Sequence, residues 1–137
     1  MLVRTLIDTD YVQFLELIRD FRDTTFTEDE FKETLRNINA MSDILVLEIS
    51  GILVATGTVF YEQKFIFNRA VLAHVEDVCV KKEYRRQGYG KLIIQSLLER
   101  ARTNRCYKIT LDCGSSNVDF YTACGFEVRG HQMSQLL

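Results

Sequence analysis

Proline is absent from all 137 residues, and no Pro/Gly/Ser-rich linker, internal repeat or low-complexity tract divides them. A chain without such boundaries is expected to form one domain, residues 1–137. Hydrophobic residues make up 47% of the chain, which at this length is enough for a stable core. The sequence therefore predicts a single domain that folds unaided.

Long apolar runs are also missing. No segment approaches the 18 uninterrupted apolar residues of a membrane span, and the N-terminal MLVRTLID lacks the apolar core of a signal peptide. We therefore expect a soluble, cytoplasmic protein with no membrane partner. The net charge of −2 argues against a nucleic-acid partner, because domains that bind nucleic acid usually carry a basic excess on one face.

Cysteine patterns typical of metal sites are absent too. The chain has no C-x-x-C pair, and its two histidines, His74 and His131, do not stand at metal-ligand spacing from a cysteine. We expect no metal, and reduced, buried thiols at Cys79, Cys106, Cys113 and Cys124. A cysteine nucleophile is a minor alternative, and structural zinc a weaker one.

What is present is a regular succession of helix and strand patterns. Apolar residues at three- and four-residue intervals, capping residues and β-branched runs indicate an α/β chain with a parallel strand–helix–strand crossover near its end. Helices are expected after Asp8 or Asp10, after the capping box Thr27–Glu30, and at 92–102 and 118–124; strands are expected at 44–48, 52–61, 71–80, 107–113 and 127–133.

The most informative stretch is VCVKKEYRRQGYGK at 78–91, where a strand ends in a basic turn that opens into a helix. Gly88 and Gly90 carry no Cβ, so the backbone can approach an anion closely, and the first N–H groups of the helix point at it. Arg85, Arg86 and Lys91 add positive charge. The turn is therefore a candidate pyrophosphate site.

Two other phosphate-binding loops do not fit these residues. The dinucleotide fingerprint needs a small residue where Ile93 stands, and a Walker A loop needs glycine at Arg85 and Ser or Thr at Leu92. The pattern R-x-x-G-x-G remains. Alone, it is equally compatible with an ordinary basic turn at a helix start, so the surrounding sequence has to decide.

The surrounding sequence resembles the GNAT superfamily of acyl-CoA-dependent N-acyltransferases, whose pyrophosphate site is such a turn. The segments EQKFI at 62–66, HVEDVCV at 74–80, CYKITLDC at 106–113 and NVDFYTACGF at 117–126 resemble the glucosamine-6-phosphate N-acetyltransferases in particular. The resemblance implies a GNAT-type fold, in which helices flank a central mixed β-sheet. It also implies transfer of the acetyl group of acetyl-CoA to the amine of glucosamine 6-phosphate by direct attack.

The resemblance assigns residues to acetyl-CoA binding. The turn would hold the pyrophosphate, and the backbone of the preceding strand would hydrogen-bond the pantetheine as a further strand would. The expected contacts are Val78, Cys79, Val80, Arg85, Arg86, Gln87, Gly88, Tyr89, Gly90, Lys91, Asn117 and Tyr121. Asn117 would contact the pantetheine, cap the helix that follows it, or do both.

Acetyl transfer also needs an acceptor for the amine, a donor to the oxyanion and a proton for the leaving thiolate. Tyr121 aligns with the tyrosine that hydrogen-bonds the coenzyme A sulfur, while its neighbour Phe120 is the more natural core residue. Glu76 and Asp77 would point to opposite faces of their strand and Asp112 would end the next one, where an ammonium group could bind. A main-chain N–H near Val78 is the expected oxyanion donor.

The substrate phosphate needs cations, and here the sequence departs from the family. Leu136 stands where we align a phosphate-binding arginine, and Phe67 stands where a histidine is frequent. Lys64, Phe65, Ile66, Tyr107 and Lys108 match substrate-contacting positions, and we expect Arg22, or else Arg129, to compensate. The resemblance implies a homodimer with shared active sites, to which the apolar C-terminus would contribute.

Two other functions remain open. A GNAT enzyme for another small amine or a protein N-terminus would explain the missing arginine. A non-catalytic acyl-CoA-binding module is a second alternative, although such a module would need neither Tyr121 nor the carboxylates at 76, 77 and 112.

Overall fold

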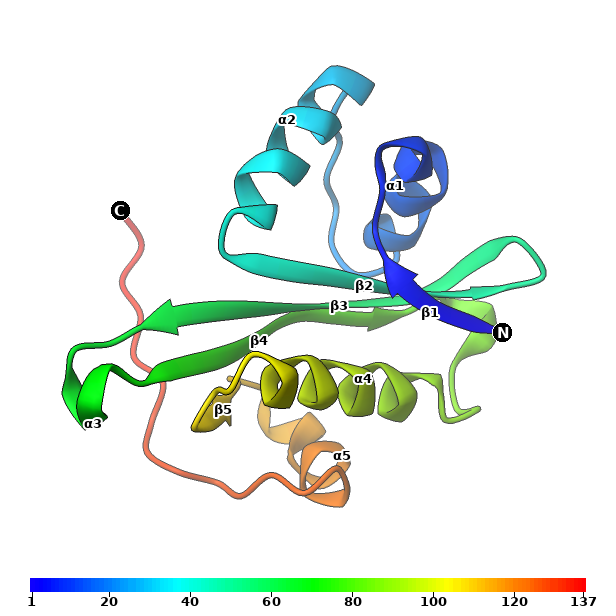
Figure 1. Cartoon of the computed structure of the whole chain (residues 1–137). Helices are drawn as coiled ribbons and strands as arrows, with labels where there is room; N and C mark the ends of the chain where they lie inside the picture. The colour runs from blue at the N-terminus through cyan, green and yellow to red at the C-terminus, as the bar shows by residue number, and fades with distance from the viewer.

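A computed structural model describes residues 1–137 as a twisted, five-stranded sheet with helices on both faces (Figure 1). The strands lie in sequence order; the first four are antiparallel to their neighbours, and β5 runs parallel to β4. They are β1 (Leu2–Thr5), β2 (Ser42–Ile49), β3 (Ile52–Gln63), β4 (Val71–Val80) and β5 (Lys108–Thr110). The helices are α1 (Tyr11–Arg19), α2 (Glu28–Asn39), α3 (Ile66–Arg69), α4 (Tyr89–Thr103) and α5 (Val118–Ala123). The expected α/β class with a mixed sheet is confirmed.

The helices α1 and α2 cover part of one face of the sheet (Figure 1). The predicted capping box starts α2: the Thr27 hydroxyl accepts the Glu30 N–H and the Glu30 carboxylate accepts the Thr27 N–H. The expectation that Asp8 or Asp10 caps α1 is wrong, because the Asp10 carboxylate accepts hydrogen bonds from Arg4 and from the Ile7 N–H instead. The buried side chains between these layers are Leu6, Leu17, Phe31, Leu35, Ile44, Val46, Leu53 and Cys79.

The helix α4 packs against the other face, above a larger core. Its buried side chains Ile93, Ile94 and Leu97 contact β3 and β4. Gly57 of β3 allows this close approach, because a Cβ at Gly57 would lie 2.8 Å from Ile93 Cγ2 and 2.9 Å from Leu97 Cδ1. The helix start, and with it the basic turn, is therefore positioned directly by the middle of the sheet.

The central strand β4 is irregular on both of its sides. Towards β3, Thr56 pairs with Cys79 and Thr58 with Glu76, so Asp77 and Val78 lie opposite the single residue Gly57 in a β-bulge. Towards β5, pairing ends at His74 and Thr110, although β4 continues to Val80. The two parallel strands therefore separate beyond His74.

Several expected elements differ from the structure. The strand β1 was not predicted, and the strand expected at 107–113 is shortened to Lys108–Thr110 because it leaves β4 there. The strand expected at 127–133 is wrong: these residues are exposed and irregular, since no strand of the same chain lies beside them to accept their hydrogen bonds. The 44–48 and 52–61 hairpin is confirmed, with Ser50 and Gly51 both at positive φ in its turn. None of the helices combines the length and the apolar character needed to cross a membrane.

Candidate active site

The basic turn between β4 and α4 has the geometry of an anion site. Arg86 and Gly88 adopt left-handed backbone conformations, with φ of 62° and 85°, which fold the chain tightly before α4. The first intrahelical bond is donated by Leu92 to the Gly88 carbonyl at 3.1 Å, and no side chain caps this end. The N–H groups of the first turn are therefore available to a pyrophosphate.

The basic side chains of the turn divide into two groups. Arg85 donates to the Val80 carbonyl at 2.9 Å and to the Asp20 carbonyl at 3.5 Å, so it holds the turn against β4 and the end of α1. The Asp20 carboxylate also accepts the Lys82 N–H at 3.1 Å. Arg86 and Lys91 are exposed and form no ion pair within the chain. These two remain free to meet negative charge.

The gap between β4 and β5 opens after His74 and extends to the turn at the end of β4. Beyond His74, the backbone of β4 has no strand on its β5 side. Val78 and Val80 are partly buried against the core beneath α4, whereas Cys79 is buried on the side of α1. The three residues thus present an unpaired backbone edge at the place where we expected pantetheine to lie.

Three carboxylates gather where the strands separate. Burial raises the pKa of Glu76, and the negative charges of Asp77 and Asp112 raise it further. The expectation that Glu76 and Asp77 point to opposite faces relied on regular strand alternation, which the bulge interrupts: Asp77 has φ 51° and both side chains are exposed. The site therefore combines three acidic groups that influence one another, and it suits a cationic amine.

Tyr121 is more buried than Phe120, the reverse of the burial expected for the two side chains. Tyr121 is half-buried against the main core, and its ring packs edge-on against Phe120 at 4.9 Å and Phe126 at 6.0 Å. Burial is the main cause that raises the pKa of Tyr121, with Cys113 and Cys124 adding to it, so the phenol is protonated at neutral pH. Phe120 is the exposed one, and its Cζ would lie 3.3 Å from a Cβ at Gly90.

Asn117 ends a short 3-10 turn, Ser115–Asn117, directly before α5. Its side chain makes no capping hydrogen bond, so the expected cap is absent and a contact with pantetheine stays a prediction.

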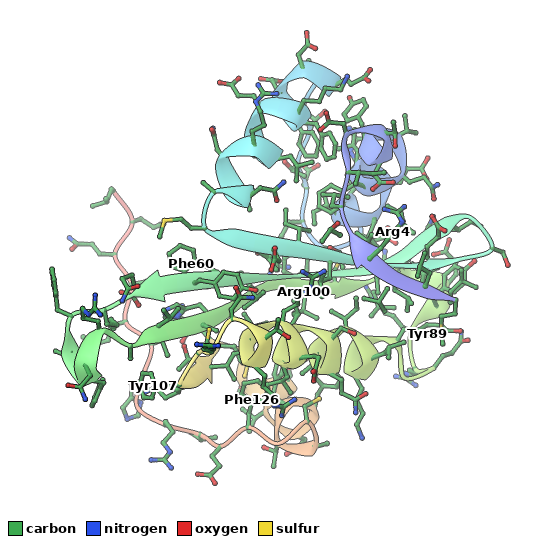
Figure 2. All side chains as sticks on the ribbon, viewed as in Figure 1. Arg4, Phe60, Tyr89, Arg100, Tyr107 and Phe126 are labelled. Carbon is green, nitrogen blue, oxygen red and sulfur yellow. The ribbon has the colours of Figure 1, made fainter.

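Gln87 and Tyr89 flank Gly88, and Tyr89 lies at the end of α4 remote from Phe60 and Tyr107 (Figure 2). The turn before α4 and the end of the sheet near Phe60 and Tyr107 therefore lie at opposite ends of the molecule.

The residues expected to bind the sugar phosphate are scattered within the single chain. Arg22 lies over the Phe21 ring at 4.6 Å and donates to the Phe21 carbonyl. Lys64 contacts the Glu62 carboxylate at 3.4 Å, and Lys108 lies 5.5 Å from the Tyr107 ring centroid. None of these cations forms an ion pair with the three carboxylates.

Other expected contacts lie outside the carboxylate site. Phe65 and Ile66 are exposed, at 94% and 58%, beside the left-handed residues 67–69 of α3. Arg129 forms an ion pair with Glu127 at 3.1 Å. The Arg129 guanidinium is therefore already paired within its own chain.

Three of the four cysteines are poor nucleophiles. Burial raises the pKa of Cys79 to about 12 and is the main cause that raises the pKa of Cys106 and Cys124. The expectation of four buried thiols is confirmed only for Cys79, because Cys106 and Cys124 are partly buried and Cys113 is exposed. No group of three histidine, cysteine or acidic side chains is arranged to hold a metal ion.

Sequence reasoning missed a polar row across the sheet. His74 Nε2 lies 2.9 Å from Glu62 Oε1, and His74 Nδ1 lies 3.1 Å from Thr110 Oγ1. In the sequence, Glu62 stands out only as part of the EQKFI segment, and His74 only as a histidine without metal-ligand spacing. Strand alternation offered a signal, since His74 stands two residues before Glu76, and Thr110 two before Asp112.

Comparison with known proteins agrees with this arrangement. The Acetyltransferase (GNAT) family matches residues 11–126. Glucosamine 6-phosphate N-acetyltransferase 1 of Dictyostelium discoideum is 36% identical over 126 residues, covering 88% of this chain and 80% of the relative. Glucosamine 6-phosphate N-acetyltransferase of Arabidopsis thaliana is 34% identical over 128 residues, covering 89% and 86%.

Solved structures show the same relationship. The crystal structure of glucosamine-6-phosphate N-acetyltransferase from Arabidopsis thaliana superimposes with a TM-score of 0.94 at 32% identity, covering 98% of this chain and 97% of that one. A Trypanosoma brucei acetyltransferase superimposes with a TM-score of 0.93 at 27% identity, covering 99% of each chain. The chain therefore belongs to the GNAT acetyltransferase family and, within it, to the family of the glucosamine 6-phosphate N-acetyltransferases.

Proposed function

We propose that the protein transfers the acetyl group of acetyl-CoA to the amine of glucosamine 6-phosphate. The products are N-acetylglucosamine 6-phosphate and coenzyme A, and the reaction is a step toward UDP-N-acetylglucosamine. The observation that carries the proposal is that an anion-binding turn, an open strand edge, a protonated tyrosine and an acidic group follow one another around the end of β4. The names of the similar proteins support this choice of substrate.

The residues of the turn suit the pyrophosphate of acetyl-CoA. Its left-handed residues and the uncapped start of α4 supply converging N–H donors, and Arg86 and Lys91 supply charge. From there, pantetheine would extend along the backbone of Val78, Cys79 and Val80, where β5 has left β4. This path would bring the thioester between the bulge at Asp77 and the ring of Tyr121.

The acidic group at 76, 77 and 112 would recognise the amine as an ammonium ion. Burial raises the pKa of Glu76 and the negative charges of Asp77 and Asp112 raise it further, so a cation bound by this group relieves their repulsion. After loss of a proton, the neutral amine attacks the thioester carbonyl directly. No enzyme nucleophile is required, in keeping with the raised pKa values of the buried cysteines.

Two groups would stabilise the later stages of the reaction. The bulge turns the backbone near Val78 out of the regular ladder with β3, so that its N–H is our candidate for the oxyanion donor. The Tyr121 hydroxyl, kept protonated by burial, would donate to the departing thiolate of coenzyme A.

We further propose a homodimer in which the C-terminal segment completes the partner's active site. Residues 127–137 are exposed and have no strand neighbour in their own chain, and Met133, Leu136 and Leu137 are more than nine-tenths exposed. Such a segment gains hydrogen bonds and apolar burial by pairing with a second sheet. Sedimentation velocity should then show a dimer, and a monomer at micromolar concentration would contradict this proposal.

A second candidate is acetylation of another amine. Its support is Leu136, which stands at the position of the expected phosphate-binding arginine. Arg22 stays our candidate for phosphate binding. An Arg22→Ala variant should raise the KM for glucosamine 6-phosphate without changing the KM for acetyl-CoA, and an unchanged KM for both would exclude the role.

The deciding experiment is a substrate panel. Purified protein is incubated with acetyl-CoA and with glucosamine 6-phosphate, unphosphorylated glucosamine, polyamines or peptide N-termini, and acetylated products are measured by mass spectrometry. Strong preference for the phosphorylated sugar supports the proposal. Turnover confined to another amine would keep the chemistry but replace the substrate, and coenzyme binding without product would favour a binding module.

A further inference from the structure

Glu62, His74 and Thr110 form a continuous hydrogen-bonded row across β3, β4 and β5. The imidazole bridges the other two side chains, at 2.9 Å from Glu62 Oε1 and 3.1 Å from Thr110 Oγ1. The Phe60 ring packs beside it at 5.8 Å. The His74 side chain is about one-third exposed, so the row lies at the surface of the sheet and solutes can reach it.

The protons of this row can be assigned from the chemistry of its members. The hydrogen bond from His74 is the main cause that lowers the pKa of Glu62, so that carboxylate is ionised and can only accept. Nε2 of His74 therefore donates to Glu62, and in the tautomer with its single proton on Nε2 the ring leaves Nδ1 as an acceptor. It follows that Thr110 donates its hydroxyl proton to Nδ1, which leaves the Thr110 oxygen as an acceptor for a further donor.

The strand register places this acceptor next to the acidic group. His74 is paired with Thr110; Glu76 follows two residues later on the same face of β4, and Asp112 follows two residues after Thr110, just beyond the end of β5. Two residues along a strand span about 6.6 Å, a distance that one water molecule bridges. An ammonium ion held by Glu76 and Asp112 is thus within reach of Thr110, directly or through that water.

The acidic group creates a need for such an acceptor. Carboxylates near an ammonium ion stabilise its charged form and therefore hold its proton in place. They bind the substrate, yet they oppose the deprotonation that attack requires. A neutral acceptor beside them resolves this conflict.

We propose that Thr110 and His74 relay the proton away from the substrate amine. In this step an ammonium N–H bond breaks and its proton passes to the Thr110 oxygen, while the Thr110 O–H proton passes to His74 Nδ1. The neutral amine and an imidazolium result, and the Glu62 carboxylate stabilises the imidazolium. Thr110 is then a catalytic residue, and His74 and Glu62 are positioning residues that act through it.

Charged groups face the imidazole from three strands. From β3 it faces Glu62, whose second oxygen is 3.4 Å from Lys64 Nζ. From β4 it is influenced by Glu76, and on β5 the nearest charged side chain is Lys108, whose ammonium lies over the Tyr107 ring. Transfer of a proton to His74 therefore places positive charge between two carboxylates.

The inference rests on the proposed transfer to an amine, and the pH dependence of kcat/KM tests it. The wild-type protein is first given the amine panel, and the best amine is used for the Thr110→Val, Thr110→Ser and His74→Gln variants. Thr110→Ser keeps the hydroxyl and serves as the conservative rescue. Thr103→Val, an exposed hydroxyl at the end of α4, is the matched control.

At neutral pH, Thr110→Val and His74→Gln should lower kcat/KM for the amine by about 10²-fold, in the range of general base catalysis. The loss should shrink as rising pH supplies free amine, with the KM for acetyl-CoA unchanged and Thr110→Ser close to wild type. A loss that is constant across pH, or full activity in Thr110→Val, would overturn the relay. Preference for a different amine would revise the proposed substrate only, while no turnover with any amine would overturn both proposals.

Discussion

Gly57 offers a sharp test of how the sheet positions α4. In a Gly57→Ala variant, the new Cβ would lie 2.8 Å from Ile93 Cγ2 and 2.9 Å from Leu97 Cδ1. Both contacts are shorter than a methyl group tolerates, and both partners are fully buried, so they cannot move aside freely. The helix or the bulge must shift instead. We expect overpacking to cost about 1–3 kcal/mol.

A smaller effect acts in the opposite direction. Replacing glycine by alanine restricts the unfolded chain and stabilises the fold by about 0.4–1 kcal/mol where the backbone permits it. The net expectation for Gly57→Ala is therefore a loss of about 1–2 kcal/mol in the free energy of unfolding, measured by urea denaturation. Because α4 carries the acetyl-CoA turn, the KM for acetyl-CoA should rise as well.

The matched control is Gly114→Ala. Gly114 has an ordinary negative φ, and a Cβ there would meet no atom within 4 Å, so only the effect on the unfolded chain remains. This variant should be unchanged or slightly more stable. If Gly57→Ala were as stable as Gly114→Ala, α4 would not be pressed against β3 at this point, and our account of how the turn is positioned would be refuted.

Three further predictions concern single side chains. Tyr121→Phe should lower kcat by about 10²-fold with little change in either KM, because it removes only the proton donor to the thiolate; unchanged kcat in a coenzyme-release assay would exclude that role. Burial raises the pKa of Asp10, but hydrogen bonds from Arg4 and from the Ile7 N–H outweigh it and lower the pKa below 3.8, so Asp10 contributes stability above that pH and loses it as the pH falls further. Asp10→Asn should therefore destabilise the protein at pH 7 and weaken the dependence of its unfolding free energy on pH below 4, as urea denaturation can show; an unaltered dependence would contradict this. Cys113 should be the first thiol modified by a maleimide and Cys79 the last, and peptide mass spectrometry showing the reverse order would contradict the burial described here.

The sequence predicts most of the fold because most of its elements follow local rules. The capping box at Thr27 and the positive-φ turn at Ser50–Gly51 each depend on residues close together in the chain. The pairing of β1 joins residues 2–5 to residues 45–48 of β2, and the length of β5 depends on where it leaves β4. Pairing between distant segments leaves no local sequence pattern, so the sequence does not predict β1 and predicts too long a strand for β5.

The candidate site shows the same division. The turn at Arg85–Lys91 is recognisable from spacing because its chemistry lies in consecutive residues. The exposure of both Glu76 and Asp77 is not, because a bulge changes the direction of side chains and its positive-φ residue is Asp77 rather than a glycine. The polar row through His74 was missed for a related reason, since its members are brought together only by the register of three strands.

The contact between Phe120 and Gly90 joins the two ends of the acetyl-CoA path. One face of the Phe120 ring meets the first turn of α4, where pyrophosphate would bind, and the ring also packs against Tyr121, which would meet the sulfur. The distance between the pyrophosphate site and the Tyr121 hydroxyl therefore depends on the Phe120 side chain. A substitution at Phe120 that changes this distance would misplace the thioester relative to Tyr121. Acetyl transfer would then slow, although every group that touches the coenzyme stays in place.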